Sequence, residues 1–191
     1  MSLSPTAVAK VLRSPAAGQV NFKVDAIAVN QLQMESVAKA IEGNELKIEV
    51  GGTGSMGAAY TSWKGAVWKS GETKYKGRIT LDGPGVVDNA IGRAAIFHES
   101  VHALIDLKDL KPSELQDEVA AYLADALFMR ANNQKIPPGN PPLVKAIYAA
   151  ADAIIDKHKL TTKKGVTLSW KDCEALGTAI KACPDYSQLK E

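Results

Sequence analysis

The chain of 191 residues has few cysteines, no long apolar run and almost no excess charge. Its only two cysteines, Cys173 and Cys183, are too few for a disulfide framework. On one straight helix their separation in sequence would place them about 15 Å apart, beyond the reach of a disulfide bond. We therefore expect two free thiols that are buried or partly buried.

No stretch of 18 apolar residues is present, so the sequence predicts no membrane-spanning helix. The first twenty residues lack the apolar core of a secretory signal, because Lys10, Arg13 and two prolines interrupt their apolar positions. We expect a cytoplasmic protein. Export by a route that needs no signal peptide, or excision from a larger polypeptide, would leave the same sequence pattern.

The net charge of +2 lacks the strong positive excess that is typical of nucleic-acid binding proteins. Basic clusters at residues 74–78 and 157–164 are therefore interpreted as solvated surface. With 46% hydrophobic and 23% charged residues, the composition is that of an ordinary folded protein. At this length the chain fits one domain with a substantial core.

The pattern of hydrophobic residues predicts a mixed α+β fold. Residues 1–22 have no consistent period and contain two Ser-Pro steps, so we expect an irregular N-terminal segment before a single domain over residues 23–191. Helices are predicted at about 24–41, 87–108, 114–130, 143–158 and 169–183, and strands at 46–50, 58–63, 65–69 and 77–81. We expect a small mixed or antiparallel sheet packed against a helical bundle.

Two of the three histidines lie four residues apart in the segment FHESVHALIDL, residues 97–107. Apolar residues recur around them at helical spacing, and His98 and His102 both lie on the stripe that must face inward. Positions i and i+4 are adjacent on a helix surface, so two imidazoles can bind one zinc ion at about 2.0 to 2.1 Å. A shared metal would satisfy two polar groups whose unpaired burial is costly.

Glu99 lies between these histidines and is offset from His98 by one residue. The offset keeps its carboxylate out of direct contact with the metal but close enough to bind a metal-bound water. Zinc lowers the pKa of such a water to about 7, and Glu99 can accept its proton as the water attacks a carbonyl carbon. The alternative is a pair of core histidines that hydrogen-bond to backbone or carboxylate groups.

A catalytic zinc site needs a third protein ligand and one open position. A metzincin would have glycine three residues, and histidine six residues, after the second histidine. Ile105 and Lys108 occupy those positions, so that class is excluded. Asp106 lies about 12 Å along the helix axis from His98, too far to join a compact tetrahedron.

The next predicted helix is better placed to supply the third ligand. Ser113 and Gln116 form a capping-box pattern that starts this helix after a short turn, which folds it back against the histidines. Among its acids Glu118 is the predicted ligand, since it lies well inside the helix and the small residue Ala121 follows one turn later. The other candidates are Asp109 near the turn, Glu114 and Asp117.

The segments HESVHA and DEVAAYLADAL together resemble the gluzincin group of zinc metallopeptidases, in particular compact members such as ImmA/IrrE-like domains. The resemblance covers residues 94–128. It implies that His98, His102 and Glu118 bind one zinc ion and that Glu99 is the general base. It also implies that an edge strand holds a peptide or protein substrate in an extended form, and GRITL, residues 77–81, is the matching segment.

Two features of that group have no clear match. Thermolysin-like members have an aspartate four residues after the ligand glutamate, which orients a histidine ligand. Here that position is Tyr122, and Asp125 lies about one turn too late. No motif marks the downstream histidine or tyrosine that stabilises the oxyanion, for which the candidates are Tyr122, Tyr148 and His158. The simpler interpretation of His158 is a surface histidine at a helix end.

The sequence therefore predicts a zinc-dependent metallopeptidase that hydrolyses peptide bonds. The main alternative is a catalytically inactive zincin-like domain in which the metal or the helix pair has a structural or binding role. The presence of Glu99 disfavours this alternative, because a structural site has no use for a general base. The third hypothesis is a helical binding module that carries the motif by chance.

Overall fold

The computed structural model describes residues 3–53, 57–64, 75–135 and 141–189 and confirms the α+β fold. In chain order the α-helices are α1 (Pro5–Leu12), α2 (Gln31–Glu42), α3 (Ala90–Leu107), α4 (Glu114–Ala131), α5 (Pro142–His158) and α6 (Trp170–Lys181). The strands are β1 (Phe22–Val24), β2 (Ile27–Val29), β3 (Leu46–Val50), β4 (Ala58–Ser62), β5 (Gly77–Leu81) and β6 (Val166–Leu168). Three short 3₁₀ helices are described: η1 (Ala17–Gln19), η2 (Pro84–Asp88) and η3 (Pro184–Tyr186).

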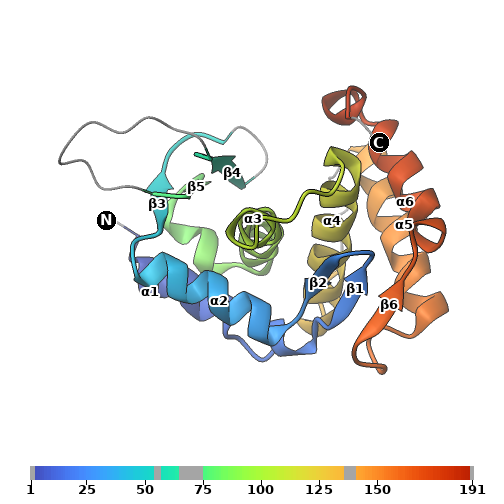
Figure 1. Ribbon diagram of the computed structural model, residues 1–191, viewed down its shortest axis with the longest axis horizontal. Helices are drawn as coiled ribbons and strands as arrows, with labels where there is room; N and C mark the ends of the chain where they lie inside the picture. Colours follow the sequence, from blue (N-terminus) through green and yellow to red (C-terminus); the bar gives the residue numbers. More distant parts are fainter. Residues whose placement is uncertain (1–2, 54–56, 65–74, 136–140, 190–191) are drawn as a thin grey trace.

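Helix α3 lies in the middle of the molecule and contacts elements from both sides (Figure 1). On one side are α1, α2 and the sheet formed by β3, β5 and β4. On the other side is α4, which in turn contacts α5 and α6. The two histidines of the motif therefore lie on a helix that is held in place from both sides.

The sheet beside α3 has the order β3-β5-β4, with β5 parallel to β3 and antiparallel to β4. Gly77, Ile79 and Leu81 of β5 are buried and alternate with the partly buried Arg78 and Thr80, as expected for a strand with one face on the core. The expectation that GRITL is an edge strand was wrong, because β5 is central. The edge strand that contacts α3 is β4.

A second sheet, of order β2-β1-β6, was not predicted. Strand β1 pairs with β2 in an antiparallel hairpin and with β6 in parallel, which joins the N-terminal part of the chain to residues 166–168. The prediction of one helix over residues 24–41 was therefore wrong in its first part. Helix α2 begins only after Asn30, whose side chain accepts a hydrogen bond from the Gln33 backbone N–H at 3.1 Å.

The expected irregular segment over residues 1–22 also contains regular structure. Residues 5–12 form α1, which begins at the N-cap Ser4, and its residues Val8, Ala9 and Leu12 are fully buried. The Ser-Pro step at this point starts a helix because proline is tolerated in the first turn. The predicted strand at residues 65–69 lies outside the described residues.

Helices α3 and α4 pack closely through aromatic and small side chains. The rings of Phe97 and Phe128 stack with their centroids 4.8 Å apart. Ala120, Ala121 and Ala124 of α4 are completely buried, and such small side chains allow helix backbones to approach closely. The predicted helices of the second half of the chain agree with α3, α4, α5 and α6 to within three residues at each end.

Cys173 and Cys183 are both buried and free, which confirms the expectation from their spacing. Among the described helices, none has the length and apolar character needed to cross a membrane.

The start of α3 is packed so tightly that it tolerates only glycine at position 92. A Cβ atom on Gly92 would lie 2.2 Å from the backbone oxygen of Val86 in η2. Alanine is normally better than glycine inside a helix by about 1 kcal/mol. We nevertheless expect Gly92→Ala to lower the thermal unfolding midpoint, because η2 must move away from α3. Gly83→Ala, whose Cβ would meet open space, is the control and should change the midpoint little. An unchanged midpoint for Gly92→Ala would contradict this packing.

Candidate metal centre

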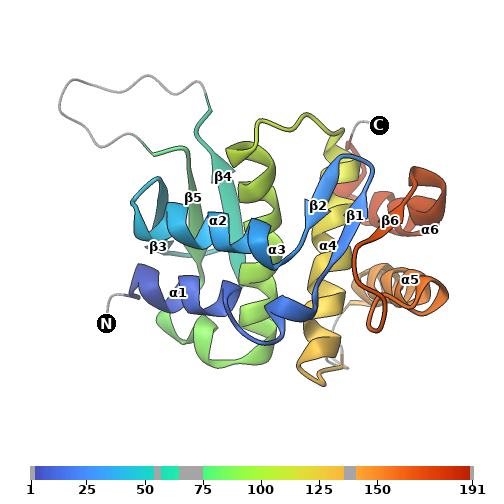
Figure 2. The ribbon, with the colours of Figure 1, turned by 60° about the horizontal axis from the view of Figure 1, so that its bottom comes forward.

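The candidate centre lies between α3 and α4, and both helices have well-defined starts. The Asn89 side chain caps α3 by accepting a hydrogen bond from the Gly92 backbone N–H at 2.7 Å. The capping box predicted for α4 is confirmed: the Gln116 N–H donates to Ser113 Oγ at 3.2 Å, and the Ser113 N–H donates to Gln116 Oε1 at 2.9 Å. The short connection turns the chain back, so the two helices run side by side (Figure 2).

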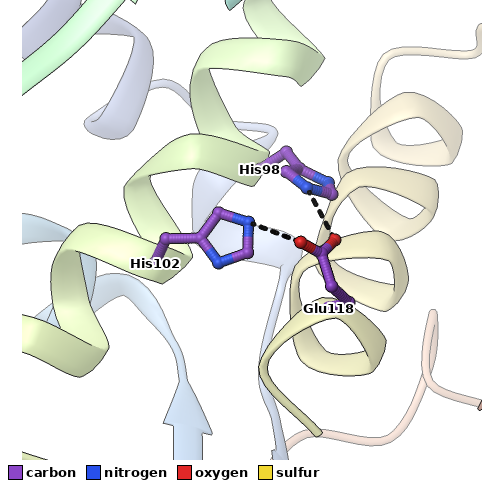
Figure 3. A group of neighbouring side chains, drawn as sticks. All are labelled: His98, His102 and Glu118. Atoms are coloured by element: carbon purple, nitrogen blue, oxygen red, sulfur yellow. Dashed lines mark ion pairs between the residues drawn. The ribbon is translucent and has the colours of Figure 1, made fainter. Parts of the chain in front are cut away.

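His98, His102 and Glu118 converge between these helices (Figure 3). His98 Nε2 lies 3.6 Å from Glu118 Oε2, and His102 Nε2 lies 3.7 Å from Glu118 Oε1. All three side chains are largely shielded from solvent, with exposed fractions of 10%, 13% and 17%. The structure therefore brings together the three residues that the sequence predicted as ligands.

The geometry of this triad fits a small metal ion. Ligand atoms that surround a zinc ion tetrahedrally are about 3.3 Å apart, and one ligand atom from each of the three residues lies within 4.8 Å of the others. Glu118 Oε2 is buried and has no hydrogen-bond partner, although a buried carboxylate oxygen is normally paired. Among the described residues, no other group of three His, Cys, Asp or Glu side chains has this arrangement.

Asp117 orients His102 and is not a member of the triad. Its Oδ1 atom lies 2.6 Å from His102 Nδ1. When Nδ1 donates its proton to this carboxylate, the lone pair of Nε2 is directed towards Glu118, which is the arrangement that a metal-binding imidazole needs. The sequence placed Asp117 among the ligand candidates; the structure gives it this supporting contact instead.

The electrostatic environment of the triad stabilises positive charge. Burial lowers the pKa of His98, but the Glu118 carboxylate and other nearby acids outweigh this effect and the net pKa is raised. Burial opposes protonation of His102 as well, yet the hydrogen bond to Asp117 and the charge of Glu118 raise its pKa to about 9. Burial raises the pKa of Glu118, and His98 and His102 reverse this to a net lowering. A cation between these side chains would meet the same favourable field.

Glu99 lies outside the triad, on the side of α3 that faces the sheet. Its Oε2 atom accepts a hydrogen bond from the backbone N–H of Tyr60 in β4 at 2.7 Å. Glu99 is close enough to both histidines to raise their pKa values. This position agrees with the expectation that Glu99 does not itself bind the metal.

The remaining acids of this region do not contribute to the triad. Asp106 accepts a hydrogen bond from the Tyr60 hydroxyl group at 2.8 Å, which agrees with its exclusion as a ligand. Asp109 is exposed and forms an ion pair with Lys64. Glu114 is an exposed residue of the first turn of α4.

One tyrosine borders the triad and binds a second tyrosine. The Tyr122 ring meets the His98 ring edge-on, with centroids 4.7 Å apart. The Tyr122 hydroxyl group donates to the Tyr186 hydroxyl oxygen at 3.0 Å. Sequence reasoning missed Tyr186, which lies in η3 near the C-terminus. No motif or spacing links it to Tyr122, and only the packing of η3 brings the two residues together.

The other two candidates for oxyanion stabilisation differ in position. The Tyr148 hydroxyl group donates to Asp125 Oδ2, and Asp125 is buried with its Oδ1 atom lacking a hydrogen-bond partner. Burial raises the pKa of Asp125, and His98 is near enough to oppose this effect. His158 Nε2 lies 3.3 Å from Asp172 Oδ1 in α6, so the His158 side chain lies beside that helix and is not a member of the triad.

Comparison of the chain with models of protein families, with curated proteins and with solved structures found no match. The centre is therefore interpreted from its own residues. Two imidazoles and one carboxylate, held by two helices and bordered by a separate carboxylate, define a candidate three-ligand metal centre.

Burial of the tyrosines leads to a prediction at alkaline pH. Burial raises the pKa values of Tyr60, Tyr122 and Tyr148 well above the ordinary value of 10, and that of Tyr186 to about 12. The folded chain then binds more protons than the unfolded chain above pH 10, so these groups contribute stability that is lost as the pH rises from about 10 towards 12. Tyrosinate absorbance near 295 nm, followed together with circular dichroism, should show that most tyrosines ionise only as the helices unfold. Ionisation of four or five tyrosines near pH 10 with the helices intact would contradict this environment.

Proposed function

We propose that this protein is a zinc-dependent metallopeptidase in which His98, His102 and Glu118 bind the metal and Glu99 is the general base. The observation that carries the proposal is the convergence of the three side chains from α3 and α4 around a buried carboxylate oxygen that has no hydrogen-bond partner. A divalent cation would supply the missing partner for that oxygen. It would also account for two largely shielded histidines beside each other.

The donor set favours zinc. Zinc binds imidazole nitrogen and carboxylate oxygen atoms at tetrahedral sites, and three protein ligands leave the open position of a catalytic site. When bound, zinc polarises a carbonyl group and lowers the pKa of a coordinated water to about 7. Asp117 supports this use of His102 by holding its Nδ1 atom.

Glu99 is the residue best placed to move protons. Its Oε2 atom is held by the Tyr60 backbone N–H, and this hydrogen bond leaves Oε1 for proton transfer. The carboxylate would accept a proton from the attacking water and deliver it to the leaving amine. This role requires a carboxylate at a fixed position next to the metal ligands, which α3 provides because Glu99 directly follows His98.

The strand next to Glu99 supports a peptide substrate. Strand β4 is an edge strand that contacts α3. An extended peptide can add to such an edge through main-chain hydrogen bonds, beside the Tyr60 N–H group that Glu99 occupies. Substrate binding is thus proposed at β4 instead of at GRITL. Tyr186 is proposed as the group that stabilises the oxyanion, since its hydroxyl oxygen accepts the Tyr122 proton and its own proton remains to be donated.

Zinc affinity tests the ligand assignment. We expect the wild-type chain to bind one zinc ion, and Glu118→Gln to weaken binding most because it removes a charged ligand. Asp117→Asn should weaken binding about 10- to 100-fold, the usual effect of losing a group that orients a ligand. Glu114→Gln makes the same change of charge on the same helix and should leave affinity nearly unchanged. Competition with a chromophoric chelator measures all four constants, and equal losses for Glu114→Gln and Glu118→Gln would refute the assignment.

Peptidase activity tests the role of Glu99. Wild-type protein loaded with zinc should cleave members of a diverse peptide mixture, as detected by mass spectrometry. Glu99→Gln should keep its zinc and lose activity by about 10²- to 10⁴-fold, because only proton transfer is removed. Zinc binding without cleavage of any peptide would favour the inactive zincin-like domain. A chain that binds no zinc would favour the helical module with a chance motif.

A further inference from the structure

We propose that Tyr60 is a positioning residue, which fixes the Glu99 carboxylate by tying strand β4 to helix α3 at two points. The backbone N–H and the hydroxyl group of this one residue bind two acids of α3, Glu99 and Asp106. The inference rests on the proposed function, in which Glu99 is the general base. It also gives a role to Asp106, the second acid of the motif segment, which like Glu99 lies outside the triad.

The first contact uses the free edge of the sheet. Gly57 and Trp63, at either end of β4, form their backbone hydrogen bonds with residues on the β5 side of the strand. Hydrogen-bonding direction alternates along a strand, so the N–H of Tyr60 points away from β5. On an edge strand this N–H group would otherwise be open to water or to another strand. Here it donates to Glu99 Oε2 at 2.7 Å.

The second contact lies two helical turns further along α3. The Tyr60 hydroxyl group donates to Asp106 Oδ2 at 2.8 Å, and Asp106 follows Glu99 by seven residues, about 10.5 Å along the helix axis. Tyr60 and Asp106 are both partly buried, which limits the competition from water for this bond. Burial and the Asp106 carboxylate raise the pKa of Tyr60, so the hydroxyl group stays a proton donor.

The neighbouring strand leaves room for the Tyr60 ring at Gly77. A Cβ atom at position 77 would lie 2.2 Å from the Tyr60 hydroxyl oxygen and 2.7 Å from two ring carbons. Tyr60 pairs with Ile79 and Ser62 pairs with Gly77, so the ring extends diagonally over β5. Only glycine at this position leaves the space through which the hydroxyl group reaches Asp106.

The two contacts together restrain the general base. A glutamate side chain has several rotatable bonds, and the hydrogen bond from the Tyr60 N–H reduces the conformational freedom of Glu99. This restraint is effective only if β4 keeps a fixed position relative to α3. The hydroxyl bond to Asp106 fixes β4 at a second point and so prevents the strand from shifting along the helix. Loss of this bond should therefore misplace the carboxylate without disturbing the metal ligands, which meet one another between α3 and α4.

The kinetic test uses Tyr60→Phe, which keeps the ring and the backbone N–H but removes the hydroxyl group. We expect kcat to fall about 10- to 100-fold and zinc affinity to stay within about twofold of wild type. Tyr75→Phe makes the same chemical change on the same side of the molecule and is the control, with unchanged kcat. An unchanged kcat for Tyr60→Phe, or a parallel loss of zinc affinity, would overturn the positioning role.

A second measurement does not depend on catalysis. Amide hydrogen exchange, followed by NMR on the purified chain, should show that the Tyr60 N–H is protected in the wild type and in Tyr75→Phe. It should exchange at least about tenfold faster in Tyr60→Phe, because only one of the two hydrogen bonds from Tyr60 to α3 then remains. Slow exchange of the Tyr60 amide in the wild type, together with faster exchange in Tyr60→Phe, supports the two-point attachment. This result would hold even if the wild type cleaves no peptide. In that case only the proposed function fails. Exchange of the wild-type Tyr60 amide at the rate of an unfolded chain would overturn the inference whatever the activity.

Discussion

The close antiparallel packing of α3 against α4 is the constraint on which the centre depends. Phe97, the residue before His98, stacks on Phe128 of α4, and the buried alanines of α4 allow the two backbones to approach. These contacts set the rotation of both helices about their axes. As a result His98 and His102 face α4, while Glu99, one residue further around α3, faces strand β4. The two histidines of the triad and the separate carboxylate of Glu99 therefore lie on two faces of the same helix, and each face packs against a different neighbour.

The buried charges of the centre contribute little to the stability of the fold. Taking a carboxylate and two imidazoles out of water costs free energy that their mutual attraction only partly returns. The structure compensates with Asp117, which holds His102, but leaves Glu118 Oε2 and Asp125 Oδ1 without hydrogen-bond partners. Such orphaned buried oxygens are uncommon in folded proteins. A bound metal ion, as proposed, would be a direct physical reason for the arrangement around Glu118.

Much of the centre could be predicted from local sequence patterns. The spacing of His98 and His102, the helical period around them and the capping box at Ser113 are all local, and they sufficed to predict that Glu118 meets the histidines. The contacts of Tyr60 and Tyr186 could not be predicted, because they join residues that are far apart in sequence and carry no motif. Strands β1, β2 and β6 were missed for a similar reason. Each has three residues, and a strand this short depends on pairing with distant partners more than on its own hydrophobic pattern. The order of the larger sheet, with β5 in the centre, likewise follows from non-local pairing.

The central claim is that His98, His102 and Glu118 hold a zinc ion. Anomalous X-ray diffraction on crystals of the chain grown with equimolar zinc, recorded on both sides of the zinc absorption edge, tests it most directly. The account predicts one strong anomalous peak about 2.0 to 2.2 Å from the Nε2 atoms of both histidines and from a carboxylate oxygen of Glu118. A peak at other residues only, or no peak together with a direct hydrogen bond that satisfies Glu118 Oε2, would contradict it.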